Sequence, residues 1–218
     1  PSADGPTIQK AALRGLKGGS NMKRVLEMVR TFREGDDETP IILMGYTNPI
    51  EAYGPERFCV DAHKAGVDGL IVVDLPPEEA DLLAGPAAAA GLDIIRLVAP
   101  TTPDARLPVV FNGASGFVYY VSITGVTGTR TASTDELAQA LPRLRKATDL
   151  PIAIGFGIRT PELAANAVRV ADAAVVASAL LNTLEGTLDG EGKATVRTVP
   201  AVLEQLRGLA DAVHAVKK

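Results

Sequence analysis

Short apolar runs rich in β-branched residues recur along this chain at fairly even spacing. They cover residues 41–44, 70–73, 94–98, 117–121, 152–154 and 173–176. None of them alternates strictly between apolar and polar residues, which is typical of parallel strands buried on both faces. Helical patterns lie between and after these runs, over residues 21–34, 55–65, 78–90, 134–148, 161–170 and 199–216. This alternation predicts an α/β protein with a parallel sheet, either doubly wound or closed into a barrel.

The spacing favours a barrel of the TIM (β/α)8 type. The units are even, and no G-x-G-x-x-G fingerprint follows the first run, as a dinucleotide-binding sheet would require. A flavodoxin-like sheet is the alternative, but Gly45-Tyr46-Thr47 after the first run makes a poor phosphate loop. Roughly six βα units are visible, so we expect residues 1–218 to form a single barrel domain that lacks about two strands before Pro1. The strands near Ile41 and Val175 would then be open apolar edges, and the isolated chain would aggregate or need a partner.

Composition excludes several classes of protein. The 218 residues are 46% hydrophobic and 22% charged, enough to bury a sizeable core. The net charge of -4 argues against a general nucleic-acid binder. The sequence shows neither an apolar stretch long enough to cross a bilayer nor a signal-peptide pattern, which predicts no membrane association. A single cysteine, Cys59, rules out an intrachain disulfide, suits a reducing cytoplasm and is expected to pack inside a helix.

Two glycine-rich turns follow successive strands near the end of the predicted barrel. The first is Gly125-Val126-Thr127-Gly128-Thr129-Arg130, and the second is Gly155-Phe156-Gly157-Ile158. Glycine lets backbone N–H groups approach an anion closely, and a helix start adds a positive dipole. Close packing is the other use of glycine at such a turn. Together with Ser178, the two turns predict a phosphate site at the place where barrels usually hold one.

Barrel active sites form at the carboxyl ends of the strands. The polar residues expected there, together with one in the opening loop, are Asp4, Tyr46, Asn48, Asp74, Tyr119, Ser122, Thr124 and Ser178. Asp74 is open to two interpretations, a cap for the turn or for the helix from Glu78, or a side chain facing a ligand. Tyr119 and Tyr120 must point to opposite faces of their strand, so one faces the barrel interior. Asp4 could equally form an Asx-turn before Pro6.

Other chemistries are disfavoured by what the strands and helices contain. The two histidines, His63 and His214, both fall on helices of the outer ring, which argues against Ser–His–Asp catalysis and against histidine-ligated zinc. None of the predicted strands contains a lysine for a Schiff base. What remains is carboxylate, tyrosine and backbone N–H chemistry around a phosphate, with no metal site.

These residues resemble the alpha chain of tryptophan synthase, and the likeness covers essentially the whole chain. It rests on five segments: Ala3-Asp4-Gly5-Pro6-Thr7-Ile8-Gln9, Tyr46 with Asn48-Pro49, Val73-Asp74-Leu75-Pro76, Gly125-Val126-Thr127-Gly128 with Arg130, and Gly155-Phe156-Gly157-Ile158. The resemblance implies a TIM barrel that cleaves indole-3-glycerol phosphate to indole and glyceraldehyde 3-phosphate. It implies a partner, a pyridoxal-phosphate beta chain in an alpha-beta-beta-alpha complex, and no cofactor in this chain.

The resemblance also implies roles by position. Asp4 matches the aspartate that accepts the indole N–H and stabilises the positive ring after protonation at C3. Tyr46 and Tyr119 match residues of the substrate cleft, and Thr127 matches a threonine of the loop that closes against the aspartate. The phosphate cradle corresponds to Gly128, Gly157 and Ser178. The loop that meets the beta chain corresponds to Asn48 and Pro49.

The chain departs from the family pattern at three places. The family's general acid, a glutamate on the second strand, falls before Pro1, so we expect the 218 residues alone to be nearly inactive. Ala177 stands where the family usually has glycine, and Ser2 replaces a usually apolar residue. Two alternatives remain open. One is another phosphate-binding barrel, such as indole-3-glycerol phosphate synthase or phosphoribosylanthranilate isomerase, which would be expected to carry a strand lysine or a different acid–base set. The other is a catalytically dead subunit that activates a beta partner.

Overall fold

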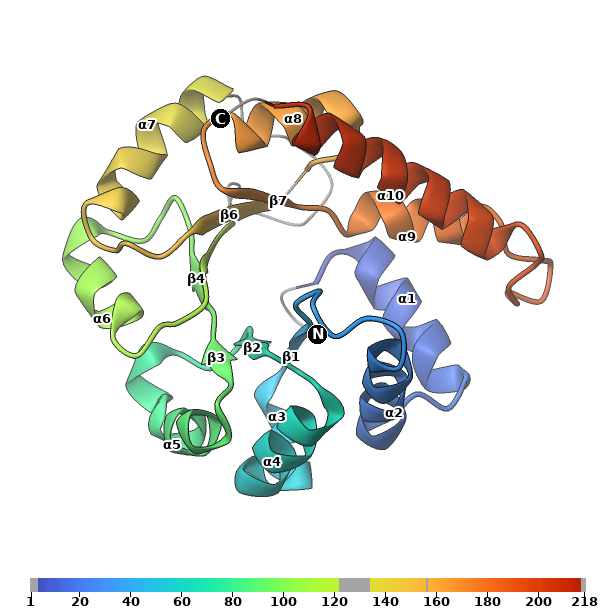
Figure 1. Cartoon of the computed structure of the whole chain (residues 1–218), viewed down its shortest axis with the longest axis horizontal. Helices are drawn as coiled ribbons and strands as arrows, with labels where there is room; N and C mark the ends of the chain where they lie inside the picture. Colours follow the sequence, from blue (N-terminus) through green and yellow to red (C-terminus); the bar gives the residue numbers. More distant parts are fainter. Residues whose placement is uncertain (1–3, 122–133, 156, 217–218) are drawn as a thin grey trace.

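Parallel strands and outer helices alternate along the chain to form a curved wall (Figure 1). The computed structural model describes residues 4–121, 134–155 and 157–216. Its strands are β1 (Ile42–Gly45), β2 (Gly69–Val72), β3 (Asp93–Ile94), β4 (Arg96–Val98), β5 (Val118–Val121), β6 (Ile152–Gly155) and β7 (Ala173–Val175). Its helices are α1 (Pro6–Lys17), α2 (Met22–Arg33), α3 (Thr47–Tyr53), α4 (Pro55–Ala65), α5 (Asp81–Ala90), α6 (Leu107–Phe111), α7 (Thr134–Arg145), α8 (Pro161–Val168), α9 (Ser178–Glu185) and α10 (Thr198–His214). Short 3-10 turns, η1 (Pro77–Glu79) and η2 (Asp104–Arg106), precede α5 and α6.

All six predicted strand runs are confirmed as strands, and every pairing is parallel. The run over 94–98 is divided into β3 and β4 at Ile95. On one side of this break β3 pairs with β2, and on the other side β4 pairs with β5. The Ile95 N–H donates back to the Leu70 carbonyl at 3.0 Å, so one extended segment joins the three-stranded and four-stranded sheets.

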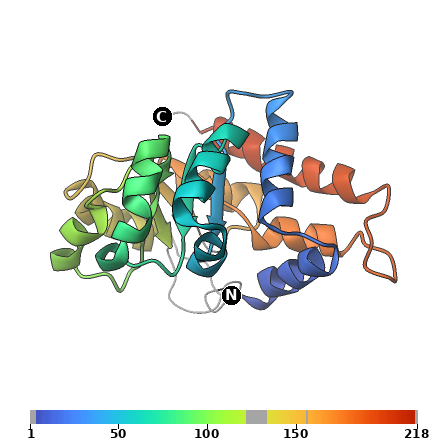
Figure 2. The same cartoon turned by 90° about the horizontal axis from the view of Figure 1, so that it is seen from below.

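The wall does not close within the part of the chain that the structure describes. There β1 pairs with β2 alone and β7 pairs with β6 alone, so the expected open edges are present. Helices α1 and α9 lie next to each other on this side of the ring (Figures 1 and 2). The described residues therefore form an open arc of parallel βα units.

Apolar side chains on the two faces of the strands form an inner and an outer core. Tyr119 faces inward with Ile71 and Ile95. Tyr120, the next residue along β5, faces outward into the cluster under α6 and α7, as the alternation of a strand requires. Two further outer clusters lie under α2, α4 and α5 and under α8 and α10. The inner face thus carries an apolar cluster that includes the buried phenol of Tyr119.

Local signals in the sequence set several helix boundaries. Helix α4 covers the predicted residues 55–65, with Pro55 at its first position and Gly66 in the left-handed region at φ +97°. The Thr160 hydroxyl accepts the Leu163 N–H and caps α8. The helix predicted from Glu78 instead begins at Asp81, because residues 77–79 form a 3-10 turn after Pro76.

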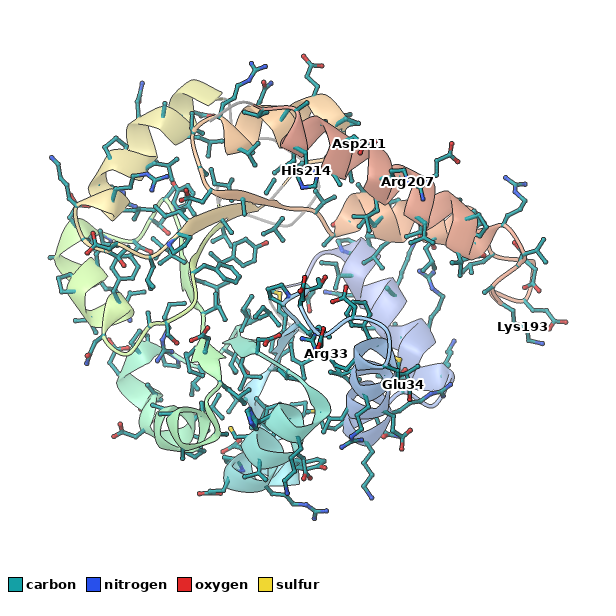
Figure 3. All side chains as sticks on the ribbon, in the orientation of Figure 1. Arg33, Glu34, Lys193, Arg207, Asp211 and His214 are labelled. Carbon is teal, nitrogen blue, oxygen red and sulfur yellow. The ribbon has the colours of Figure 1, made fainter. Side chains whose placement is uncertain are left out.

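The histidine and cysteine predictions are confirmed. His63 on α4 and His214 on α10 are both exposed, and Figure 3 labels His214 on α10. Cys59 is buried in the core under α4, and burial raises the pKa of its thiol to about 11. Over the residues described, every helix is too short or too polar to cross a membrane.

Candidate functional site

The carboxylate of Asp4 and the phenol of Tyr46 meet at the carboxyl end of β1. The Tyr46 hydroxyl donates to Asp4 Oδ2 at 2.9 Å, across 42 residues of sequence. Tyr46 directly follows β1 and is the N-cap residue of α3. Asp4 lies just before α1, where Gln9 Nε2 donates to the Asp4 carbonyl at 2.8 Å. Two residues that the sequence placed at the site separately therefore form one hydrogen-bonded pair.

Asp74 holds the start of α3 from the neighbouring strand. Its Oδ1 accepts the Thr47 N–H at 2.8 Å and the Thr47 hydroxyl at 2.9 Å. This contact matches neither interpretation of Asp74, because the carboxylate bonds to Thr47 of the preceding βα unit rather than to its own turn or to the helix after Glu78. This bond fixes the backbone immediately after Tyr46, so it supports the Asp4–Tyr46 pair indirectly.

Tyr119 lies inside the wall against the last residue of β6. A Cβ added at Gly155 would collide with the Oη, Cζ and Cε2 atoms of the Tyr119 ring. Of the two uses of glycine that the sequence left open at this turn, close packing is the one that the structure shows at Gly155. Burial raises the pKa of the Tyr119 phenol to about 12, so the hydroxyl is neutral over the physiological range.

The predicted phosphate residues are described only in part. Ser178 is the half-buried first residue of α9, and its N-cap residue Ala177 offers no side-chain acceptor to the first N–H groups of the helix. Gly157 follows β6 with φ +79°, a conformation that favours glycine. Thr127 and Gly128, with the rest of the first glycine turn, lie outside the described residues. Ser122 and Thr124 lie outside them too.

The two residues expected to meet a partner are on the surface. Asn48 and Pro49 are both exposed and occupy the first turn of α3. They lie only two and three residues after Tyr46. A protein that contacts this turn would therefore bind close to the Asp4–Tyr46 pair.

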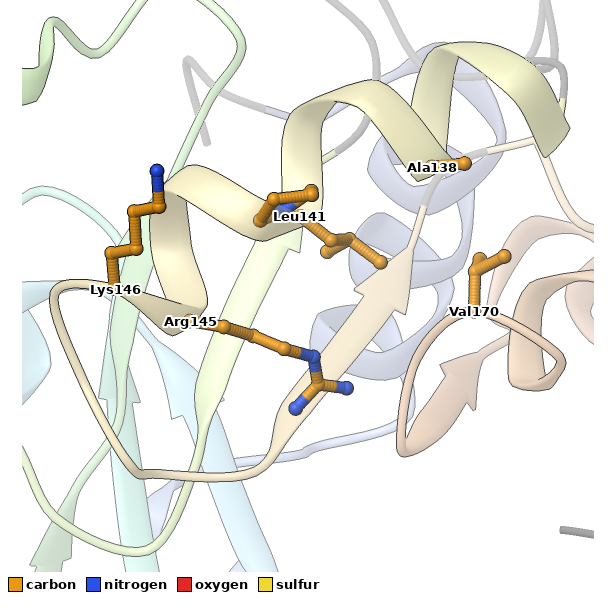
Figure 4. A pocket seen from close by; sticks show the side chains of 6 residues that line it. Ala138, Leu141, Arg145, Lys146 and Val170 are labelled. Carbon is orange, nitrogen blue, oxygen red and sulfur yellow. The ribbon is translucent and has the colours of Figure 1, made fainter.

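A cavity of about 470 Å³ lies on the outside of the wall, away from these residues. Figure 4 shows it beside α7, lined by Ala138, Leu141, Pro142, Arg145, Lys146 and Val170. None of these side chains belongs to the predicted site. In the described part of the chain, histidine, cysteine and acidic side chains form no cluster of three or more that could hold a metal ion.

The site geometry contains contacts that the sequence did not predict. The pairing of Asp4 with Tyr46 joins two distant segments, and the Gln9 contact gives no recognisable signal in the sequence. The fit of Tyr119 against Gly155 could have been suspected from the close-packing use of glycine. Taken together, the arrangement offers an aspartate that accepts a hydrogen bond from a phenol, an apolar inner face, and a helix that starts with a serine.

Comparisons with known proteins identify what this arrangement is similar to. The family profile described as Tryptophan synthase alpha chain matches residues 1–213. The tryptophan synthase alpha chain of Gluconacetobacter diazotrophicus is 77% identical over 214 residues, which cover 98% of this chain and 78% of that protein. The same-named protein of Acidiphilium cryptum is 60% identical over 218 residues, covering 100% and 79%.

Solved structures agree with this likeness. The crystal structure of tryptophan synthase subunit alpha from Legionella pneumophila str. Paris superposes with a TM-score of 0.87 at 40% identity, covering 98% of this chain and 78% of that one. A structure from Pyrococcus furiosus, described as the tryptophan synthase a2b2 complex, gives a TM-score of 0.80 at 32% identity, covering 97% and 81%.

Proposed function

Because this chain belongs to the tryptophan synthase alpha chain family, we propose that Asp4, Tyr46, Tyr119 and the start of α9 form the site at which indole-3-glycerol phosphate is cleaved. The products are indole and glyceraldehyde 3-phosphate, and the reaction serves tryptophan biosynthesis. The observation that carries this assignment is the 2.9 Å hydrogen bond between Tyr46 and Asp4 at the carboxyl end of β1. It places an oriented carboxylate where the substrates of barrel enzymes bind.

The reaction requires charge stabilisation at the indole. A proton adds to ring C3, and the bond from C3 to the glycerol chain breaks. The hydroxyl on the released carbon then loses its proton and becomes the aldehyde carbonyl. The ring carries positive charge after protonation, and the Asp4 carboxylate would accept the indole N–H and stabilise that charge. Tyr46 would orient this carboxylate, since its hydroxyl already donates to one of the two oxygens.

The apolar inner face would supply the binding surface for the indole ring. Tyr119, Ile71 and Ile95 are buried there, and partly buried apolar side chains pack against them. Because burial raises the pKa of its phenol to about 12, Tyr119 would stay neutral and pack against the indole ring rather than act as a base. Thr127 would close over the ring from its loop, as the family resemblance implies.

We place the phosphate at the start of α9. The first N–H groups of an α-helix lack partners within the helix, and its dipole favours an anion there. Ser178 adds a hydroxyl at this point, while Gly128 and Gly157 would let further backbone N–H groups approach. Ala177, where the family usually has glycine, would bring one methyl group to the edge of the cradle.

We propose a pyridoxal-phosphate beta chain as the partner, in an alpha-beta-beta-alpha complex, with no cofactor in this chain. Asn48 and Pro49 would contribute to the interface, since both are exposed next to the Asp4–Tyr46 pair. The a2b2 complex of the Pyrococcus furiosus neighbour supports this assignment. We further propose that residues 1–218 act as one barrel domain and that the protein works in the cytoplasm.

Indole release tests the proposal. The natural protein, assayed with its beta chain and indole-3-glycerol phosphate, should produce indole and glyceraldehyde 3-phosphate in equal amounts. Activation of the beta chain without indole release would instead identify a catalytically dead subunit.

A further inference from the structure

Helices α1 and α9 contact each other through two polar interactions. The Thr7 hydroxyl donates to Asn182 Oδ1 at 3.2 Å, and Arg14 Nη1 lies 3.1 Å from Glu185 Oε1. The two contacts occur in the same order along both helices, so the helices begin at the same end of the ring. Figures 1 and 2 show α1 and α9 side by side in both views.

The ends of these helices carry the two halves of the proposed site. Asp4, at the indole end, lies two residues before Pro6, the first residue of α1. Ser178, at the phosphate end, is the first residue of α9. Helix α1 thus begins just after Asp4, and helix α9 begins at Ser178. The contact between α1 and α9 therefore joins the two elements that carry the ends of the site.

The Arg14–Glu185 pair is the stronger part of this link. The Arg14 side chain is 28% exposed, and its Nη2 is fully buried without a hydrogen-bond partner. A charge-assisted bond in a partly desolvated place is stronger than an exposed ion pair. Lys10 also approaches Glu185, but at 4.0 Å and with 64% of its side chain exposed. Arg14 is therefore the residue whose loss should loosen the contact most.

We propose that Arg14 and Glu185, with Thr7 and Asn182, are positioning residues that set the distance between Asp4 and the phosphate-binding start of α9. This inference rests on the proposed function. The four side chains touch neither end of the substrate. They determine whether one substrate molecule can bind at the indole end and at the phosphate end at the same time. Once one end of the substrate has bound, binding of the other end is then an intramolecular step.

The affinities for two ligands distinguish this positioning role from a general effect on the stability of the fold. One is an unreactive indole-3-propyl phosphate, which must span both ends of the site. The other is glycerol 3-phosphate, which occupies only the phosphate end. In the natural complex with the beta chain, Arg14→Ala should lower the affinity for indole-3-propyl phosphate, the spanning ligand, at least fivefold. It should leave the affinity for glycerol 3-phosphate within twofold, because the phosphate end itself is intact.

Three further variants sharpen the test. Thr7→Val removes only the second contact and should show the same pattern more weakly. The exchange Arg14→Glu with Glu185→Arg should restore affinity for the spanning ligand. Arg57→Ala removes a matched arginine from the exposed 3.6 Å pair with Asp61 and should change neither affinity. If Arg14→Ala lowered the affinity for both ligands equally, or left the affinity for the spanning ligand unchanged, the inference would be overturned. A wild-type complex that neither binds the spanning ligand nor cleaves the substrate would instead contradict the proposed function.

Discussion

The ring of Tyr119 lies against the α-carbon of Gly155, so closely that residue 155 has no room for a Cβ. The two residues lie on the neighbouring strands β5 and β6, where Val121 pairs with Gly155, and the Tyr119 side chain belongs to the inner apolar cluster. The glycine at the end of β6 therefore sets how deep the phenol sits. This contact links the packing of the barrel interior to the shape of the proposed indole pocket.

Gly155→Ala should destabilise the chain by about 1–3 kcal/mol, since an added methyl group forces either the ring or the strand to move. The free energy of unfolding, measured by urea denaturation, checks this. Gly45→Ala is the matched control, because Gly45 ends β1 and a Cβ there would meet nothing within 4 Å. A Gly155→Ala variant no less stable than Gly45→Ala would show that the ring yields without cost.

The phenol of Tyr119 should ionise at a higher pH than that of an ordinary tyrosine. Burial raises its pKa to about 12, so the tyrosinate absorbance lost in Tyr119→Phe should come from the range above about pH 11. Below pH 10 the phenol is neutral in both the folded and the unfolded chain. Above pH 10 the unfolded chain releases its proton first, so this residue should lower the stability by about 2 kcal/mol at pH 12. A Tyr119 signal centred near pH 10 would contradict the burial.

Two aspartates that precede strands make the same pair of contacts, one with a backbone N–H at the start of the neighbouring strand and one with an arginine on a helix. Asp68, before β2, accepts the Ile41 N–H at 2.7 Å and pairs with Arg33 at 2.7 Å. Asp172, before β7, accepts the Ile152 N–H at 2.9 Å and pairs with an arginine at the end of α7 at 3.0 Å. Each aspartate thereby connects the start of the preceding strand, at Ile41 just before β1 or at Ile152 in β6, to the helix that precedes that strand.

Asp68→Ala should lower the free energy of unfolding by about 1–2 kcal/mol, because it leaves the Ile41 N–H without this acceptor. Arg33 would lose its ion pair but keep its bonds to backbone carbonyls, including that of Gly66 at 2.9 Å. Figure 3 shows Arg33 at the end of α2. Asp37→Ala, at an exposed neighbouring position, is the control and should be nearly neutral. Equal stability of the two variants would exclude the role assigned to Asp68.

A polypeptide of residues 1–218 should associate in solution. In the described structure β1 and β7 each have an unpaired edge, and exposed apolar side chains lie on the helices of the same side. They include Met28 and Phe32 on α2 and Val199, Leu203 and Leu206 on α10. Such edges and patches favour aggregation. Light scattering coupled to size exclusion should detect dimers or larger species, whereas a cooperatively melting monomer would refute this expectation.

Strong local signals in the sequence predicted most of the strands and outer helices of the fold. The strand runs are confirmed because β-branched residues fit a doubly buried parallel strand, and Pro55 and Gly66 bound α4 correctly. The short helices α3 and α6 were not predicted, since seven and five residues give little periodicity. The start of α3 depends on Asp74, which is 27 residues away, so no local pattern could reveal it.

The candidate site was predicted residue by residue, but its pairings were not. The sequence placed Asp4 and Tyr46 at one end of the barrel through the family resemblance, and the structure brings them together. Close packing, the other use of glycine that the sequence left open, is confirmed at Gly155. The opposing ring comes from another strand, so no local pattern identified it as the packing partner. The roles of Thr127, Gly128, Gly157 and Ser178 in phosphate binding and loop closure stay predictions.

Substitution of Asp4 tests the central claim most directly. In the natural protein with its beta chain, Asp4→Asn keeps the size of the side chain but removes the negative charge that would stabilise the protonated indole. We expect kcat for indole release to fall by ~10²–10⁴-fold with KM changed little, as measured by the steady-state production of indole. Asp37→Asn should retain wild-type kinetics. A kcat for Asp4→Asn within threefold of wild type would contradict the assignment of Asp4 to the reaction.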